Sequence, residues 1–280
     1  MRSILHGPYG ECVSLIDAIG RARVFDLEQP RFAGMPIHPA HQPGYFYALH
    51  RRHRDSYRPD KFGPRSGSSG VLTMMEHSGT HIDALCHQAA DLQFHGGVRV
   101  DEVERTDGFK ALGVETIKPL LGRGVLLDVA GWKNVALLPQ NYAITAEDLE
   151  GCARDARVDV RPGDVLLVRT GYATCWDDSN TYLNAAGVSK SANLWAADKR
   201  VVAVGADNMA WDAMTERDPD TNMTLFGHVH LLVTHGIHIL ENLNLEALAA
   251  ASYHEFAFVG IPLKLRGATG SPIRPLALVE

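Results

Sequence analysis

The sequence contains no long apolar run and no excess of basic residues. No segment approaches the ~18 consecutive apolar residues that a membrane-spanning helix requires. The residues before Gly20 lack the apolar stretch of a secretory signal peptide. The formal net charge is -6, whereas nucleic-acid binding requires a concentrated basic surface. One short basic run, His50–Arg54, is typical of a solvated loop. We therefore expect neither a membrane nor a nucleic acid as a partner.

The chain is also poor in cysteine. Its cysteines are spread along the sequence without the paired spacing that would indicate a disulfide framework. They are Cys12, Cys86, Cys152 and Cys175. We interpret them as reduced thiols of a cytoplasmic protein. Although Cys86 precedes His87, adjacent residues on a helix point in different directions, which disfavours a Cys–His catalytic dyad.

Histidine, by contrast, is unusually frequent. The 280-residue chain holds 14 histidines in a composition that is otherwise ordinary for a globular protein, with 45% hydrophobic and 21% charged residues. Neither a low-complexity tract nor a His tag accounts for this number. The abundance of imidazole groups therefore directs the search to metal ligands.

Short apolar segments alternate with helix-like segments along the second half of the chain. Strands are predicted at 71–76, 124–130, 165–169, 201–205, 237–240 and 255–259. Helices are predicted at 145–156, with Thr145 as N-cap, and at 226–235 and 245–251. This alternation predicts an α/β architecture in one domain, residues 1–280. The Pro-, Gly- and Arg-rich stretch 31–70 is expected to run irregularly over the surface, where it could cover a pocket.

The strongest functional signal is the run from residue 77 to residue 87. It contains the potential metal ligands His77, His81, Asp83 and His87. Imidazole and carboxylate groups together suit zinc, manganese or iron rather than calcium or magnesium. Since Gly79 is a poor helix former, we expect a strand end and a tight turn here, with Gly79 bringing the backbone close to the metal. Asp83 can bridge two cations. We place His87 on a helix that begins near Asp83, as a ligand or a proton shuttle.

A second cluster of potential ligands lies between residues 226 and 242. It comprises His228, His230, His235, His238 and Glu241. If 227–235 is helical, His228 and His235 share a face, whereas His230 points elsewhere. A buried Glu241 among apolar neighbours would be costly unless it were paired or bound to a metal. Two separated segments that meet at one site are what a binuclear centre requires.

At these residues the chain resembles the cyclase-like metal-dependent hydrolase family, which includes bacterial kynurenine formamidase and isatin hydrolase. The family signature His-x-Gly-Thr-His-x-Asp-x-x-x-His matches residues 77–87 at every fixed position. Segments 25–28, 34–36, 162–171 and 236–243 also resemble family segments, so the resemblance extends from about residue 24 to residue 262. It implies a fold of the swivelling β/β/α type, with a mixed sheet and flanking helices.

The resemblance also implies roles for individual residues. By matching position, the metal ligands would be His77, His81, Asp83, His228 and Glu241, with Asp83 as the bridge. His230 competes with His228 for the later histidine position. His87 would be the catalytic acid/base. The implied cofactor is zinc or manganese, with one or two ions per chain.

These residues predict a metal-dependent hydrolase that opens the C–N bond of a small amide, linear or cyclic. The same centre acting on an ester or lactone is the first alternative, and a metal-binding protein without turnover is the second. We expect a homodimer or homotetramer, partly from the resemblance and partly because the apolar run 43–49 is unsuited to water. The alternative for this run is that it folds back over its own active site.

Overall fold

The computed structural model describes residues 5–6, 12–13 and 15–280, and its centre is a nine-stranded mixed sheet. The spatial order is β14 (Gly270–Pro272), β6 (His81–Asp83), β12 (His238–Glu241), β11 (Ala203–Ala206), β9 (Val165–Arg169), β7 (Leu120–Asp128), β13 (Glu255–Gly260), β15 (Leu276–Val279) and β3 (Arg23–Asp26). The four strands β12, β11, β9 and β7 are parallel, and the strands outside them pair antiparallel. The expected α/β class with a mixed sheet is confirmed.

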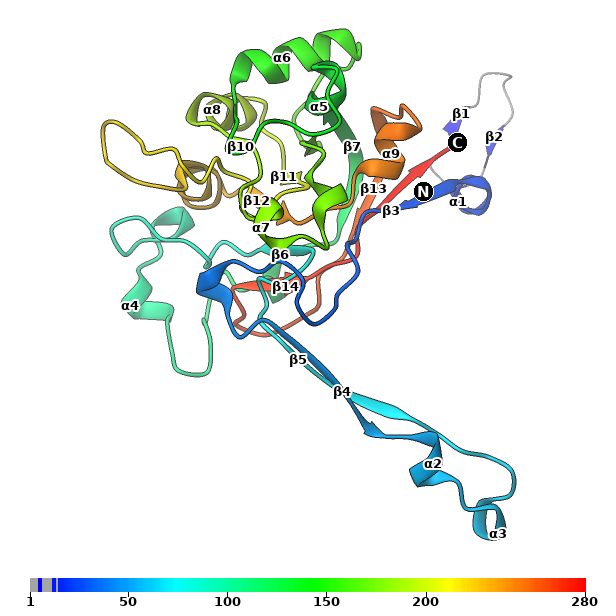
Figure 1. The fold of residues 1–280 in the computed structure, drawn as a ribbon. Coiled ribbons are helices and arrows are strands. Elements are labelled where there is room, and N and C mark those ends of the chain that lie inside the picture. The colour runs from blue at the N-terminus through cyan, green and yellow to red at the C-terminus, as the bar shows by residue number, and fades with distance from the viewer. Residues whose placement is uncertain (1–4, 7–11, 14) are drawn as a thin grey trace.

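Both faces of the sheet are covered, so its central strands are apolar throughout. Along β7, Val125 and Leu127 enter one core, whereas Leu126 enters the other. The first core is closed by α5 (Val129–Trp132), α6 (Ala146–Asp155), α8 (Lys190–Asp198) and the π-helix η5 (His228–His235). The second contains α9 (Glu246–Ala250) and strands β13 and β15. Figure 1 shows these flanking helices around the sheet.

Smaller elements connect this framework. They are β1 (Leu5–His6), β2 (Cys12–Val13), α1 (Leu15–Arg21), η1 (Pro39–His41), β4 (Tyr45–Arg51), α2 (His53–Ser56), α3 (Pro59–Phe62), β5 (Ser69–Met74), η2 (His95–Gly97), α4 (Val100–Val103), η3 (Val114–Thr116), β8 (Ala143–Ile144), η4 (Tyr172–Cys175), α7 (Ser179–Tyr182) and β10 (Gly187–Val188). No helix in the described part of the chain is long and apolar enough to cross a membrane. Cys86, Cys152 and Cys175 are free thiols, whereas the side chain of Cys12 and part of the stretch before Gly20 lie outside the described residues.

Several sequence predictions are confirmed with small shifts in their bounds. Thr145 caps α6 in a reciprocal capping box with Asp148. The strands predicted at 124–130, 165–169, 201–205, 237–240 and 255–259 correspond to β7, β9, β11, β12 and β13. The helix predicted at 226–235 is η5, which begins at His228.

One prediction about local structure is wrong. No helix begins near Asp83, because the backbone amides that would start it bind distant segments instead. The amide of Ala84 donates to Thr269 O at 2.8 Å, and that of Cys86 donates to Leu112 O. The tight turn expected at Gly79 is present, because Gly79 adopts a left-handed φ of 63° before β6. This backbone conformation favours glycine. The expectation that Gly79 brings the backbone close to a metal stays a prediction.

The stretch 31–70 was predicted to be irregular, but part of it forms regular structure. Strands β4 and β5 pair antiparallel and carry α2 and α3 at their far end. We call residues 45–74 the arm, and Figure 1 shows it extending away from the body of the molecule. The apolar run 43–49 therefore does not fold back over the site, and the part of this stretch next to the site is residues 36–41.

The fold depends strongly on Ile82, which is fully buried between two site residues on β6. We expect Ile82→Ala to lower the free energy of unfolding by about 2–5 kcal/mol, and Ile82→Val by about 0.5–1.5 kcal/mol, since both remove buried methyl groups. Urea unfolding measures both. Leu121→Ala, at a side chain that is 65% exposed, is the matched control and should change the free energy by less than about 0.5 kcal/mol. Equal losses at Ile82 and Leu121 would contradict this account of the core.

Candidate metal centre

The turn between β5 and β6 and the antiparallel pairing of β6 with β12 bring the first and second ligand clusters together. His77 lies in the turn, and His81 and Asp83 follow it on β6. The register pairs His81 directly with Glu241, the last residue of β12. Because β12 is a parallel strand, Glu241 lies at the carboxyl end of the parallel part of the sheet, where α/β proteins commonly place their sites.

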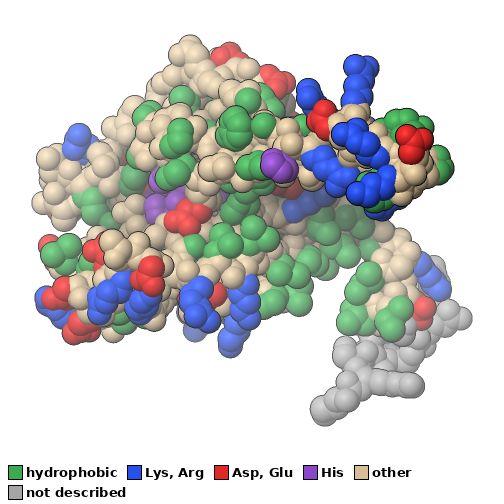
Figure 2. Space-filling view, turned by 90° about the horizontal axis from the view of Figure 1, so that it is seen from below, with side chains coloured by type: hydrophobic (Ala, Val, Ile, Leu, Met, Phe, Trp, Pro, Cys, Tyr) green, Lys and Arg blue, Asp and Glu red, His purple; other side chains and the backbone are tan. Residues whose placement is uncertain are grey.

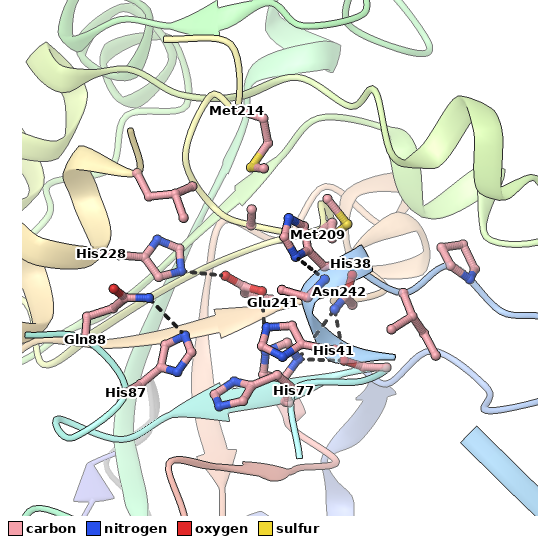
Figure 3. Close-up of a pocket in the computed structure, with 17 residues that line it drawn as sticks. His38, His41, His77, His87, Gln88, Met209, Met214, His228, Glu241 and Asn242 are labelled. Atoms are coloured by element: carbon pink, nitrogen blue, oxygen red, sulfur yellow. Dashed lines mark hydrogen bonds and ion pairs between the residues drawn. The ribbon is translucent and has the colours of Figure 1, made fainter. Parts of the chain in front are cut away.

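Four side chains converge on this point with short distances between their polar atoms. Nε2 of His81 lies 3.3 Å from Glu241 Oε2 and 3.6 Å from Asp83 Oδ1. Nε2 of His228, at the start of η5, lies 3.2 Å from Glu241 Oε1 and 3.7 Å from Asp83 Oδ2. Figure 3 shows the ring of His228 directed at Glu241, with His87 and His77 below them in this view.

Two groups of potential ligands share one carboxylate. The first comprises His77, Asp83 and His87, and the second comprises Asp83, His228 and Glu241. Within each group, the ligand atoms lie within 4.8 Å of one another. Asp83 belongs to both groups, which is the arrangement that a bridging carboxylate would need. His81 lies between them, since its Nε2 contacts both acids.

In three of the histidines, one ring nitrogen is held by a hydrogen bond, which leaves the other directed at the acids. Nδ1 of His81 donates to the carbonyl of Gly79 at 2.8 Å. Nδ1 of His228 donates to the carboxylate of Asp212, also at 2.8 Å.

His77 is held through its other nitrogen. The hydroxyl of Thr269 donates to Glu76, so its oxygen is free to accept from Nε2 of His77 at 2.8 Å. Outer hydrogen bonds of these kinds fix the ring and tautomer of metal-binding histidines.

The atoms that face the centre are buried and lack hydrogen-bond partners within the described residues. These atoms are both carboxylate oxygens of Asp83, Oε1 of Glu241 and Nδ1 of His77. His77 Nδ1 and Asp83 Oδ1 lie 2.8 Å apart without forming a hydrogen bond. A buried unpaired carboxylate is costly, and a divalent cation would satisfy all of these atoms at once. The donor set of imidazole and carboxylate therefore fits zinc or manganese.

The charges of the centre are divided unevenly among its side chains. Burial opposes protonation of His228, but the neighbouring carboxylates of Asp212 and Glu241 raise its pKa well above the ordinary value. Burial would raise the pKa of Glu241, yet the neighbouring imidazoles of His228 and His81 lower it. Burial lowers the pKa of His87 to about 3. His87 is thus a neutral base beside the carboxylates of Asp83 and Glu241.

The structure places His230 outside the centre. Its ring stacks on Phe226, with centroids 5.1 Å apart, and meets His235 edge-on at 4.5 Å. His228, which begins η5, is the histidine of this segment that reaches the carboxylates. Cys86 is buried, and burial raises the pKa of its thiol to about 12, so the thiolate that a nucleophile requires is disfavoured.

Sequence reasoning missed several residues of the site. Asp212 holds His228 through both its ring and its backbone amide. Asn242 donates to the carbonyl of Gly79, the same carbonyl that accepts from His81. His41 stacks on His77 with centroids 4.9 Å apart, and burial lowers its pKa to about 4. Asp212 and His41 lie outside the two histidine clusters, so the sequence offered little signal for them. Asn242 directly follows Glu241 in the second cluster but was not singled out.

A cavity of about 160 Å³ opens above the centre. Its floor is formed by the ligand clusters, and its sides come from residues 36–41 and from the segment that follows β11. Lining residues absent from the predicted site include His38, His41, Gln88, Met209, Met214 and Asn242. Purple histidine side chains are visible in the hollow of the surface in Figure 2.

Comparison with known proteins gives the family. A family model described as "Putative cyclase" matches residues 25–213. The chain belongs to the cyclase family. This cyclase-family chain is 29% identical to a kynurenine formamidase of Bacillus cereus over 224 residues, which are 78% of this chain and 85% of that protein. It is also 29% identical to a kynurenine formamidase of Bacillus mycoides over 225 residues, with the same coverage of each chain.

Solved structures share the fold of the cyclase-family chain. A structure described as a novel cyclase superposes with a TM-score of 0.80 at 29% identity, over 94% of this chain and 90% of that one. Isatin hydrolase A from Ralstonia solanacearum superposes with a TM-score of 0.69 at 22% identity, over 94% of each chain. The expected family and fold are thereby confirmed.

Mutation can test whether His228 or His230 of η5 is the metal ligand. We expect His228→Ala to lower the content of transition metal in the purified protein, because it removes a nitrogen that faces Asp83 and Glu241. His230→Ala is the matched control, and should retain metal because its ring packs on Phe226 and His235. Elemental analysis of the two variants and of wild type measures this. Metal loss in His230→Ala with retention in His228→Ala would reverse the assignment.

Proposed function

We propose that this cyclase-family protein is a metal-dependent hydrolase that opens the C–N bond of a small amide, linear or cyclic. The observation that carries the proposal is the pair of buried ligand groups that share Asp83, with the neutral imidazole of His87 beside them. The names of its relatives support it, since they include kynurenine formamidases and isatin hydrolases. Both names describe hydrolysis at a C–N bond.

The metal would be held by the side chains that lack partners at the centre. We assign His77, His81, Asp83, His228 and Glu241 as its ligands, with Asp83 shared between two ions where both are bound. Zinc or manganese suits this donor set, at one or two ions per chain. A divalent cation bound there would lower the pKa of water toward neutrality and polarise the scissile carbonyl.

His87 would act as the acid/base. Its ring lies tilted by 30° against that of His77, with centroids 3.9 Å apart, which places it beside the ligand groups at the cavity floor. Since burial keeps the imidazole neutral, it can accept a proton from the attacking water and deliver it to the leaving nitrogen. The carboxamide nitrogen of Gln88 lies 3.4 Å from His87 Nε2, where it can help to orient the ring.

Two other functions compete with amide hydrolysis. The same centre could hydrolyse an ester or lactone, which needs the same attack with a better leaving group. A protein that binds metal without turnover would need the ligands but not His87. A panel of N-formyl anilides, isatins and lactones, assayed with chelator-stripped protein before and after zinc or manganese is added, separates these functions.

His87→Ala tests the proposed role of His87. Because an amide nitrogen must be protonated to depart, we expect the rate on an amide to fall about 100- to 10,000-fold, with metal content near wild type. An activated aryl ester needs far less protonation, so its rate should fall much less. Steady-state kinetics on both substrates and elemental analysis measure these effects.

The outcome also distinguishes the two possible roles of His87. A large loss of metal in His87→Ala would make it a ligand of the first group. Equal losses of rate on amide and ester, at full metal content, would show that His87 does not protonate the leaving group.

The arm supports assembly into a homodimer or homotetramer. Its exposed apolar side chains lie on both strands and include Phe46 and Tyr47, which are 57% and 54% exposed. A two-stranded ribbon is marginally stable alone, and exposed apolar surface of this kind commonly marks an interface.

The tip of the arm also holds six basic and two acidic residues between 50 and 66, whereas the whole chain has a net charge of -6. Figure 2 shows these blue side chains gathered at one end of the molecule.

We propose that the arm packs against a second copy of the chain, whose remaining surface is acidic overall.

The free thiols of Cys86, Cys152 and Cys175 support the cytoplasm as the location of the protein. The single domain over residues 1–280 stays a prediction.

Light scattering tests the role of the arm. We expect wild type at micromolar concentration to have at least the mass of a dimer, and Phe46→Glu/Leu72→Glu to shift toward the 30.6 kDa monomer, because charges would enter the apolar contact. Leu121→Glu, on β7 outside the arm, is the matched control and should retain the wild-type mass. A monomeric wild type would contradict the proposed assembly.

A further inference from the structure

His228 is the start of a buried chain of hydrogen bonds that runs away from the metal centre. Its Nδ1 and its backbone amide both donate to Oδ2 of Asp212, at 2.8 and 3.0 Å. Oδ1 of Asp212 accepts from the amide of Gly227 and from Nδ2 of Asn193, each at 2.8 Å. Oδ1 of Asn193 in turn accepts from the indole Nε1 of Trp211 at 2.7 Å. Each carboxylate oxygen of Asp212 therefore holds two N–H groups, and Trp211 is the far end of the chain.

The indole of Trp211 fixes the direction of the hydrogen bonds in this chain. Because an indole N–H can only donate, the atom of Asn193 that meets it must be the carboxamide oxygen. The NH2 group of Asn193 is then directed at Asp212, which accepts from it. Since Asp212 acts as an acceptor throughout, Nδ1 of His228 is the donating nitrogen of that ring. Nε2 of His228 is left for the acids of the centre.

The backbone around the chain is shaped to bring its members together. Trp211 and Asn193 are fully buried. Trp211 has a left-handed φ of 53°, which is unusual for an aromatic residue. Asn208 stabilises this conformation, because its side chain bonds to both the amide and the carbonyl of Trp211. A Cβ on Gly227 would collide with Asn193 and Asp212, so the chain also requires glycine before His228. A strained backbone that the surrounding structure enforces in this way is typical of functional sites.

We propose that Trp211 and Asn193 are positioning residues of the metal centre. They hold the carboxylate of Asp212, which in turn holds the ring of His228 toward the acids. Neither Trp211 nor Asn193 lines the cavity. The inference rests on the proposed assignment of His228 as a metal ligand, and it does not depend on which bond the protein hydrolyses. Outer partners of metal-binding histidines typically contribute about 10- to 100-fold to metal affinity.

Trp211→Phe tests the chain with a small change, because it removes the indole N–H and keeps an aromatic ring. Trp195→Phe is the matched control. Trp195 lies on α8, as Asn193 does, and its buried Nε1 has no hydrogen-bond partner among the residues that the structure describes. We expect Trp211→Phe to weaken zinc binding about tenfold, at the lower end of the range for outer partners, and Trp195→Phe to leave it unchanged.

Calorimetry with zinc on chelator-stripped protein measures these affinities. An affinity of Trp211→Phe equal to that of wild type would overturn the inference, and so would equal losses in the two tryptophan variants. Asn193→Ala removes the donor to Asp212 while it keeps the indole, and it repeats the test if Trp211→Phe does not fold.

A double-mutant cycle separates positioning from packing, since residues that act through one another show non-additive effects. If Trp211 acts through Asp212, Trp211→Phe should cost no further zinc affinity in protein that already carries Asp212→Asn. Additive losses would mean that Trp211 supports the centre through packing alone, and would overturn the inference.

Amide exchange in the metal-free protein separates this inference from the proposed function. The backbone amides of Gly227 and His228 donate to Asp212, so their exchange with solvent reports on the carboxylate without metal or turnover. We expect both to exchange at least about tenfold faster in Trp211→Phe than in wild type, and at the wild-type rate in Trp195→Phe. If wild type binds neither zinc nor manganese but this difference is found, the proposed function fails and the positioning role holds. Unchanged exchange in Trp211→Phe would overturn the inference even in an active enzyme.

Discussion

The buried carboxylate of Asp83 is the constraint on which the rest of the site depends. Its side chain is buried, and neither of its oxygens has a hydrogen-bond partner among the residues that the structure describes. Such a group would normally be protonated or expelled, but the surrounding histidines hold the pKa of Asp83 well below its usual value. The protein therefore keeps a negative charge at the end of a short buried strand, with lone pairs directed to both sides. A cation is the partner that this geometry lacks.

The sheet topology holds the carboxylate of Asp83 and its neighbours in place. Strand β6 is held between β14 and β12, so Asp83 pairs with Gly270 on one side while His81 pairs with Glu241 on the other. A Cβ at Gly270 would come within 2.6 Å of the ring of His77. Backbone pairing thus fixes the positions of His81, Asp83 and Glu241. Hydrogen bonds to the ring nitrogens that point away from the centre fix the orientation of the histidine rings. This rigidity is what a metal site needs in order to bind without reorganisation.

The sequence predicted those parts of the structure that local chemistry determines. The capping box of α6 and the apolar runs of β7 and β9 each contain their own signal, and so does the motif 77–87, whose residue types admit few other uses. The arm was missed because its Pro- and Gly-rich composition hides two strands that pair only with each other. The helix predicted after Asp83 is absent for a different reason. The backbone amides that would start it donate instead to the carbonyls of Thr269 and Leu112, which are far away in the chain.

Residues of the site that come from isolated positions could not be found in the same way. Asp212 and His41 reach the centre through tertiary packing of loops, and neither belongs to a pattern with regular spacing. The lining of the cavity is also a property of the fold, because it depends on which side chains of two distant loops face each other.

Metal titration into chelator-stripped wild-type protein tests the central claim most directly. Zinc or manganese, followed by calorimetry and thermal unfolding, should bind at one to two ions per chain and raise the Tm, because a ligand that binds the folded state stabilises it. Binding should release protons as well, since a metal displaces them from imidazole nitrogens. The absence of binding, with an unchanged Tm at saturating metal, would contradict the account of Asp83 and of the site around it.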